Sequence, residues 1–163
     1  MMSWKEKLAK LRKDARTKKQ EQKLEHHILA EKVTDYIAEC LEVLEEFSLA
    51  TKSSIKFFDN RHKQKDRETQ KEYFTGGITL LAERRPTLRE TLLHPQDHKN
   101  QIIALMGFPH PKAIKNMEWH DDCIRFAYSD VRRRLPLSKF DGKWVKDNLE
   151  EAYQYFLTQS HRI

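Results

Sequence analysis

The chain has 163 residues, of which 38% are hydrophobic and 34% are charged. This length suffices for one domain with a core, but the charge content predicts that part of the chain stands in solvent, because a typical globular domain is about 25% charged. No apolar run reaches the roughly 18 residues of a membrane span, and the charged N-terminal segment lacks the apolar stretch of a signal peptide. We expect a cytoplasmic location, which the two widely separated cysteines, Cys40 and Cys123, also favour.

The net charge of +6 is concentrated in one segment. Residues 1–23 contain nine cations and three anions, so they hold the whole excess and the other residues are formally neutral. Long-range attraction for phosphates or anionic lipid is therefore expected from this segment. Its cations are Lys5, Lys7, Lys10, Arg12, Lys13, Arg16, Lys18, Lys19 and Lys23.

The first 75 residues contain neither glycine nor proline, and this predicts one long N-terminal helix. Ser3 and Glu6 have the spacing of a capping box and predict where the helix begins. Apolar residues at helical spacing occur early, stop across residues 16–23, and then resume as a wide stripe. We interpret residues 1–23 as a projecting basic helical arm and residues 24–163 as a single compact α+β domain. The apolar positions of the arm are Trp4, Leu8, Leu11 and Ala15.

The charge of the predicted helix reverses beyond the arm. Between residues 31 and 46 six acidic residues accompany a single cation, Lys32. A helix that is basic in one half and acidic in the other can pair antiparallel with a second copy or dock on a protein partner.

The middle of the chain has short segments rich in aromatic, aliphatic and threonine residues at 54–58, 72–81 and 87–93. They predict a small antiparallel β-hairpin or three-stranded sheet, with helix as the alternative for residues 78–84. The charged residues between the first two segments are expected to form the connection between two strands.

The C-terminal part is predicted to contain about three helices. Asp97 has the position of a cap for a helix through Met106, and apolar residues from Ile114 to Leu135 keep helical spacing. Asp141-Gly142 then precedes a last amphipathic segment. The predicted fold class is therefore α+β, helix-dominated, with a long N-terminal helix, a small antiparallel β element and a C-terminal group of about three helices.

Two basic groups are candidates for nucleic-acid binding, because lysine and arginine neutralise phosphates and an indole ring offers a face to a base. The candidates are Trp4, Lys5, Lys7, Lys10, Arg12, Lys13, Arg16, Lys18 and Lys19 in the arm, and Arg61, Lys63, Lys65 and Arg67 in the connection between two strands. The alternatives for the arm are a solvated helix, a protein-docking surface or a membrane surface, and the alternative for the second group is a mobile solvated loop.

A further basic run, Arg132-Arg133-Arg134, is predicted to end a helix, where cations complement the negative end of the helix dipole. Arg84, Arg85 and Arg89 would extend it only if the fold brought them onto the same surface. The aromatic residues of the chain are expected to lie mostly in the core, and the sequence singles out no stacking platform among them.

Catalytic signatures are weak. Glu118, His120, Asp121, Asp122 and Cys123 cluster within six residues, but acids are common in the first turns of a predicted helix and a His-Asp dipeptide arises readily by chance. The sequence has no phosphate-cradling glycine loop, nucleophile elbow or CxxC pair. We therefore expect no metal site and no cofactor, and an enzyme is the third alternative after a nucleic-acid-binding factor and an adaptor.

The sequence favours a non-catalytic nucleic-acid-binding or nucleoprotein-assembly factor that contacts phosphates through residues 1–23. The alternative is a structural subunit or adaptor that docks on a protein partner, or forms a homodimer, through the charge-polarised long helix. DNA and RNA are equally compatible with these residues, and a membrane surface is the less favoured partner.

Overall fold

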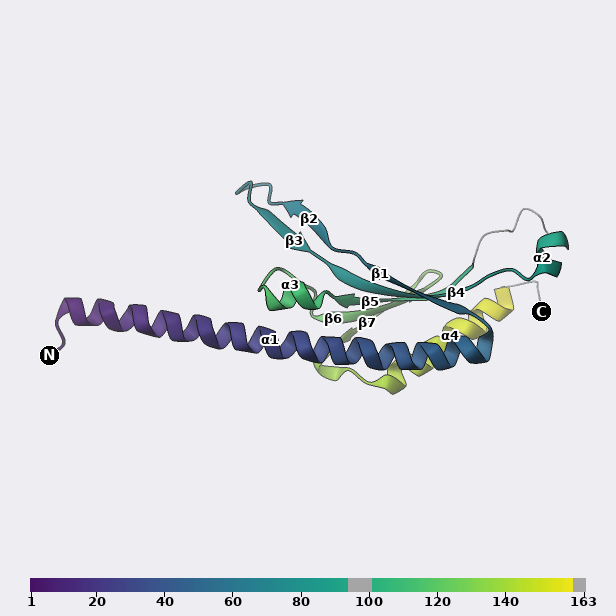
Figure 1. The fold of residues 1–163 in the computed structure, drawn as a ribbon, viewed down its shortest axis with the longest axis horizontal. Coiled ribbons are helices and arrows are strands. Elements are labelled where there is room, and N and C mark those ends of the chain that lie inside the picture. Colours follow the sequence, from purple (N-terminus) through teal and green to yellow (C-terminus); the bar gives the residue numbers. More distant parts are fainter. Residues whose placement is uncertain (94–100, 160–163) are drawn as a thin grey trace.

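The computed structural model describes residues 1–93 and 101–159, without the side chains of Tyr73 and Phe74 (Figure 1). A long helix, an antiparallel sheet and a C-terminal helix make up the molecule, which confirms the α+β class. Within the described residues, none of the helices combines the length and apolar character of a membrane span.

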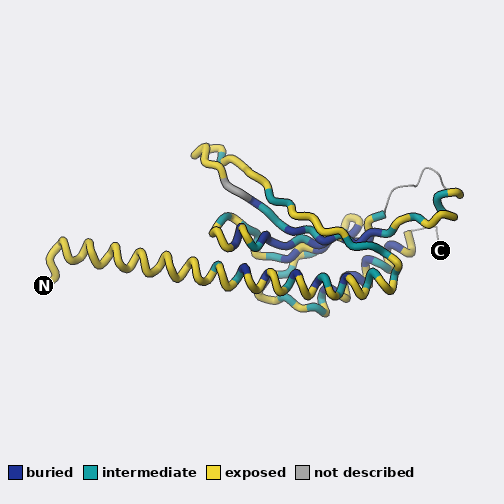
Figure 2. The backbone as a smooth tube through the Cα atoms, viewed as in Figure 1, coloured by how far each residue is buried: buried dark blue, intermediate teal, exposed yellow. Residues whose placement is uncertain are grey.

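Helix α1 (Trp4–Thr51) is a single uninterrupted helix of 48 residues, about 72 Å long. Its start confirms the predicted capping box: the Ser3 hydroxyl accepts a hydrogen bond from the Glu6 amide, and the Glu6 carboxylate accepts one from the Ser3 amide. The helix ends at Lys52, whose left-handed backbone (φ 54°) closes the last turn. Every residue from 1 to 25 is exposed, whereas the buried positions of α1 begin at Ala30 (Figure 2).

Five strands form one antiparallel sheet in the order β1-β4-β5-β6-β7. The strands are β1 (Ser54–Asp59), β4 (Gly77–Arg84), β5 (Gln101–Pro109), β6 (Cys123–Tyr128) and β7 (Val131–Pro136). A second pair, β2 (His62–Lys65) and β3 (Glu72–Thr75), continues the β1–β4 hairpin beyond the edge of the main sheet. We call residues 60–76 the β-finger; it projects from the same end of the molecule as the free part of α1 (Figure 1).

Helices α1 and α4 (Gly142–Gln159) cover one face of the sheet, and the core lies between them and the strands (Figure 1). Leu44 of α1, Leu149 of α4, and Leu80, Met106 and Phe126 of the sheet are among its fully buried side chains. Three short helices complete the fold: α2 (Leu88–Leu93), α3 (Pro111–Lys115) and the 3₁₀ turn η1 (Leu137–Lys139). None of the described helices covers the opposite face of the sheet, which we call the open face.

Several predicted elements are wrong. The segment expected to be a helix through Met106 is strand β5, although its predicted cap at Asp97 lies outside the described residues. Residues 114–135 do not form a helix; they contain the end of α3, a loop, and strands β6 and β7. A short apolar run fits a buried strand as well as a buried helix, and tertiary pairing with β4 decides for the strand.

The predicted C-terminal group of three helices is therefore one long helix, α4, with the short helix α3 before the last two strands. In the middle of the chain, segments 54–58 and 72–81 are strands as predicted, but 87–93 contains helix α2. The sheet has five strands, where a hairpin or three strands were expected, because segments read as helix supply β5, β6 and β7.

Candidate nucleic-acid interface

The nine cations of residues 1–23 all lie on the exposed part of α1. Within the described residues none of them forms an ion pair, so their charges are not neutralised by the protein itself. The Trp4 indole is also exposed, with 77% of its surface accessible. This part of α1 is an exposed helical segment with a net positive charge.

The cations of the arm are not spread evenly around the helix. At about 100° per residue, five of them fall within a sector of about 60°, which we call the cationic stripe. The apolar residues of the arm lie directly beside this stripe, and its three acids lie on the opposite side. The stripe extends over 18 residues, about 27 Å. Its members are Lys5, Arg12, Arg16, Lys19 and Lys23.

The second predicted group lies in the β-finger. Residues 60–71 were expected to be a loop, but His62–Lys65 form strand β2, and the turn follows at residues 66–71. Lys63 forms an ion pair with Glu72 across the finger, while Lys65 and Arg67 are exposed. The Glu68 amide donates a hydrogen bond to the Asp66 carboxylate in the turn, and this lowers the pKa of Asp66. The finger therefore carries less unneutralised charge than the arm.

Arg61 has a different environment from the other finger cations. Its guanidinium donates two hydrogen bonds to the Glu118 carboxylate, at 3.0 and 3.1 Å, and its side chain is 27% exposed. The pair connects the base of the finger to the loop at residues 116–122, which lies far away in the sequence. We therefore interpret Arg61 as a residue that positions the finger against this loop.

The base of the finger is held by further contacts. His110, which is 4% exposed, accepts a hydrogen bond from the Lys112 amide through Nδ1, so its Nε2 donates to Asp59 at 2.9 Å. That hydrogen bond is the main reason why the pKa of Asp59 is lowered. Gly77 is needed because a Cβ atom there would lie 2.7 Å from the Phe108 carbonyl oxygen. These contacts fix the direction in which the finger leaves the sheet.

The open face of the sheet presents two rows of side chains that follow the strand register, because directly paired residues point to the same face. The first row has an aromatic residue at its β1 end and arginines at its β7 end. The second row has a cation at each end and apolar residues between them. The first row is Phe58, Thr79, Gly107, Arg125 and Arg134, and the second is Lys56, Leu81, Leu105, Ala127 and Arg132.

Part of the charge on this face is neutralised. Lys56 pairs with the buried Glu83 at 2.8 Å. Asp121 lies between two cations, since its carboxylate is 2.5 Å from Arg125 and 3.5 Å from Arg134. The net positive charge of the open face therefore lies toward β7.

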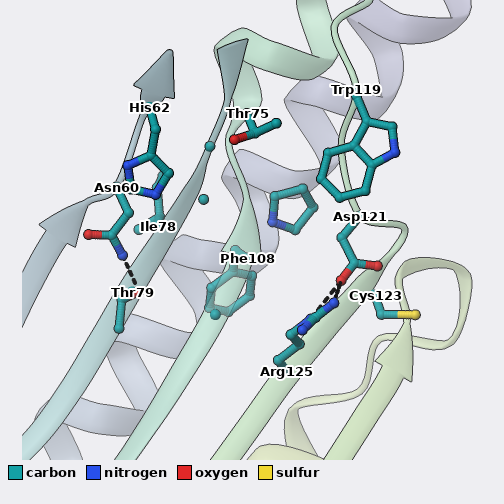
Figure 3. Close-up of a pocket in the computed structure, with 14 residues that line it drawn as sticks. Asn60, His62, Thr75, Ile78, Thr79, Phe108, Trp119, Asp121, Cys123 and Arg125 are labelled. Atoms are coloured by element: carbon teal, nitrogen blue, oxygen red, sulfur yellow. Dashed lines mark hydrogen bonds and ion pairs between the residues drawn. The ribbon is translucent and has the colours of Figure 1, made fainter. Parts of the chain in front are cut away.

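A cavity of about 250 Å³ opens where the β-finger, the sheet and the loop at residues 116–122 meet (Figure 3). Trp119 and Asp121 line it from the loop, Asn60 and His62 from the finger, and Arg125 from β6. The Trp119 side chain is 65% exposed, so its indole is a wall of the cavity that solvent also reaches.

The interpretation of Arg132-Arg133-Arg134 as a helix end is wrong, because these residues lie in strand β7 and alternate between its two faces. Arg132 and Arg134 belong to the open face. Arg133 points to the helix side, where it donates hydrogen bonds to Glu151 and Asn148 of α4. The pairing lowers the pKa of Glu151 and raises that of Arg133. Arg84 is engaged by Glu90 at 2.7 Å and does not join the β7 arginines.

The cluster at residues 118–123 lies in the loop before β6 and at the first residue of that strand, not at the start of a helix. Glu118 and Asp121 are engaged by arginines, and His120 lies 3.3 Å from Asp122. Within residues 1–93 and 101–159 no three histidine, cysteine or acidic side chains lie close enough together to hold a metal ion. His94 and His98, which are four residues apart in the sequence as two metal ligands on one helical face would be, lie outside the described residues.

The structure thus places the predicted binding residues in two regions, the arm and the finger, and adds a third, the open face. Phe58, Trp119, Arg125, Arg132 and Arg134 were not among the predicted binding residues. The spacing of Arg132 and Arg134 was the one signal in the sequence that could have identified the open face, because residues two positions apart in a strand share a face.

Comparisons of the chain with protein-family models, with curated proteins and with solved structures give no match. We therefore base the functional proposal on the residues and geometry of this chain.

Proposed function

We propose that the protein is a non-catalytic nucleic-acid-binding or nucleoprotein-assembly factor, in which the basic arm makes salt-sensitive contacts to phosphates. The observation that carries the proposal is the cationic stripe: five unpaired cations on one side of an exposed helix. A line of positive charge about 27 Å long is complementary to a nucleic-acid backbone, which carries regularly spaced negative charge.

Other parts of the chain would support the arm in this role. The wide apolar stripe of α1 from Ala30 onward anchors the helix to the sheet, so the arm is held at a fixed angle to the body. Lys65 and Arg67 of the β-finger would add phosphate contacts at the same end of the molecule as the arm (Figure 1). A cytoplasmic location fits this proposal, since both Cys40 and Cys123 are free thiols.

The test is fluorescence anisotropy of labelled single- and double-stranded DNA and RNA, titrated with the intact protein and with residues 24–163 at several salt concentrations. Residues 1–25 contribute nothing to the core, so the shortened chain should retain its fold, which circular dichroism checks. We expect binding with a steep salt dependence that the shortened chain loses. Absence of binding by the intact chain at 0.05 M salt would overturn the proposal.

A second candidate function, self-association through α1, is favoured by an acidic groove between α1 and α4. Four glutamates and two apolar residues of α1 line it, together with Asp141, Gly142, Lys143 and Lys146 at the start of α4, where the two lysines offset part of the negative charge. The α1 residues of the groove are Glu39, Glu42, Val43, Glu45, Glu46 and Leu49. The groove therefore offers negative charge flanked by apolar side chains, which complements the composition of the arm.

The arm of a second copy fits this groove in an antiparallel arrangement with its two-fold axis near residue 26, where residue i lies opposite about residue 52 − i. Lys10 then lies opposite Glu42, and Lys7 opposite Glu45. Leu49 of the groove is 84% exposed in the single chain.

Light scattering of the purified protein tests this candidate by measuring its mass. A dimer should be dissociated by Glu42→Lys with Glu45→Lys, and restored when Lys7→Glu and Lys10→Glu are added to the same chain. A monomeric mass for the unchanged protein at micromolar concentration refutes this arrangement and leaves the nucleic-acid proposal untouched.

A further inference from the structure

The loop that carries Trp119 is held to the rest of the fold by ion pairs of the residues on both sides of it. On one side Glu118 accepts two hydrogen bonds from Arg61 at the base of the β-finger. On the other side Asp121 pairs with Arg125 and Arg134 of the open face. Trp119 is held between these two anchors, yet 65% of its surface remains exposed. A large aromatic residue on a doubly anchored loop has little conformational freedom left to lose when it binds a partner.

The surface beside Trp119 has the chemistry of a base-binding site. The indole and the His62 imidazole line the same cavity, and Asn60 and Arg125 supply amide and guanidinium groups at its walls (Figure 3). Phe58, 44% exposed, lies in the same row of the open face as Thr79 and Arg125. Aromatic faces stack on bases, and amide and guanidinium groups form hydrogen bonds with base edges.

We propose that this surface binds the bases of a single-stranded nucleic acid, with one base stacked on Trp119 in the cavity and the neighbouring bases lying across the open face toward Phe58. Arg132 and Arg134 of β7 would contact the phosphates. The inference deepens the proposed function: it names single strands as the substrate class and adds a second binding site to the arm.

The exposed indole and the dimensions of the site favour a single strand over a duplex. In a duplex the base faces are stacked on one another, so a protein aromatic side chain reaches them only in an unstacked strand. The open face from Phe58 on β1 to Arg134 on β7 spans four strand spacings, about 19 Å, and sheets of similar width bind two or three bases. The cavity of about 250 Å³ is below the usual range for whole small-molecule ligands, as expected for a pocket that receives one base.

The two sites should respond differently to salt. The arm has five unpaired cations in one stripe, whereas Arg125 and Arg134 share the Asp121 carboxylate. Stacking on Trp119 does not depend on counterion release, so the contribution of the open face should persist at salt concentrations that remove that of the arm.

The experiment uses the full-length chain with Trp4→Phe, titrated with ten-nucleotide oligo(dT) and oligo(U) in 0.2 M salt while tryptophan fluorescence is recorded. The remaining tryptophans are Trp119 and Trp144, and the latter is packed against Phe126. We expect quenching by the single strands and none by a blunt duplex of the same length. Comparison of oligo(dT) with oligo(U) shows whether the site prefers the DNA or the RNA strand, and oligo(dU) separates the effect of the sugar from that of the thymine methyl group.

Variants then assign the binding to residues. Their affinities are measured in 0.2 M salt by the fluorescence anisotropy of end-labelled oligonucleotides, because a substitution of Trp119 removes the tryptophan reporter. Trp119→Ala should weaken binding about 5- to 160-fold, the range found when one stacked base loses its aromatic partner, and Trp119→Phe should retain most of the affinity. Phe58→Ala should also weaken binding. Phe57→Ala is the matched control, because Phe57 is the next residue of β1, is similarly exposed, and points to the other face of the sheet. Trp119 is mainly exposed, so its variants should keep the thermal midpoint of the parent protein.

The outcomes separate this inference from the proposed function. If Trp119→Ala and Phe57→Ala bind single strands equally well, the base-binding site is refuted, and the arm proposal is judged by its own salt dependence. If cation substitutions in the arm weaken binding only at low salt while quenching at saturation persists, both proposals hold. If no oligonucleotide quenches the fluorescence in 0.2 M salt, the open face is not a base-binding surface.

Discussion

The arrangement of cations around the arm leads to a prediction that net charge alone does not make. The triple substitution Arg12→Gln, Arg16→Gln and Lys19→Gln removes three of the five cations of the cationic stripe. The matched triple substitution Lys7→Gln, Lys10→Gln and Lys18→Gln removes the same charge from the rest of the helix circumference. Glutamine has nearly the same helix propensity as lysine and arginine, so both variants should keep α1 intact.

The expected effect follows from counterion release. If all five stripe cations contact phosphates of a duplex, log K should fall with log salt at a slope of about −4.5, and two remaining contacts give about −1.8. Between 0.05 and 0.2 M salt the parent should lose about 500-fold in affinity and the stripe variant about 12-fold. The off-stripe variant should keep the slope of the parent.

Fluorescence anisotropy of a labelled 20-base-pair duplex, titrated at four salt concentrations, measures these slopes. Equal slopes for the two variants would refute the reasoning, because the arm would then act only through its net charge. Circular dichroism of both variants is the control for helix content.

Three further predictions concern the body of the protein. Leu44→Ala should lower the free energy of unfolding by about 2–5 kcal/mol in urea titrations, because Leu44 is 1% exposed and its removal leaves a cavity in the core. Burial raises the pKa of the Cys40 thiol to about 12, so Ellman's reagent at pH 8 should modify only the half-buried Cys123 in the native protein, and modification of Cys40 should require unfolding. The pKa of Asp59 is lowered in the folded state, so the stabilisation from its hydrogen bond with His110 is present above the unfolded pKa of about 4 and is lost as pH falls through the folded pKa. Asp59→Asn should therefore flatten the decrease of the urea midpoint between pH 6 and pH 3; an unchanged acid limb contradicts this assignment.

Local signals predicted the long helix well. The absence of glycine and proline before residue 76 and the Ser3–Glu6 capping box are properties of adjacent residues, and both are features of α1 in the structure. The acidic residues beyond the arm were likewise visible in the sequence, whereas the wide apolar stripe, expected from residue 24, becomes buried only at Ala30, because Leu24 and Ile28 are exposed.

The strands of the C-terminal half were not predictable in the same way. Residues 101–109 have the apolar character of either a buried helix or a buried strand, and β5 forms because β4 and β6 pair with it on both sides. The error at β6 and β7 has the same origin. Their turn includes Ser129, whose positive φ of 50° carries no glycine or asparagine signal in the sequence.

The open face was hidden because its residues meet only through tertiary structure. Trp119 is positioned by Glu118 with Arg61 and by Asp121 with Arg125, and the first of these pairs spans 57 residues of sequence. The exposed rows depend on the register of five strands, three of which were read as helix. The spacing of residues along the chain does not reveal such contacts.

Photocrosslinking of the intact protein to a thiouridine-containing single strand, followed by mass spectrometry of the linked peptides, tests the central claim of nucleic-acid binding most directly. We predict crosslinks in residues 1–25 and, if the open face binds bases, also in residues 116–134. Crosslinks confined to the acidic half of α1 or to α4, or no crosslink at 0.05 M salt, would contradict this account.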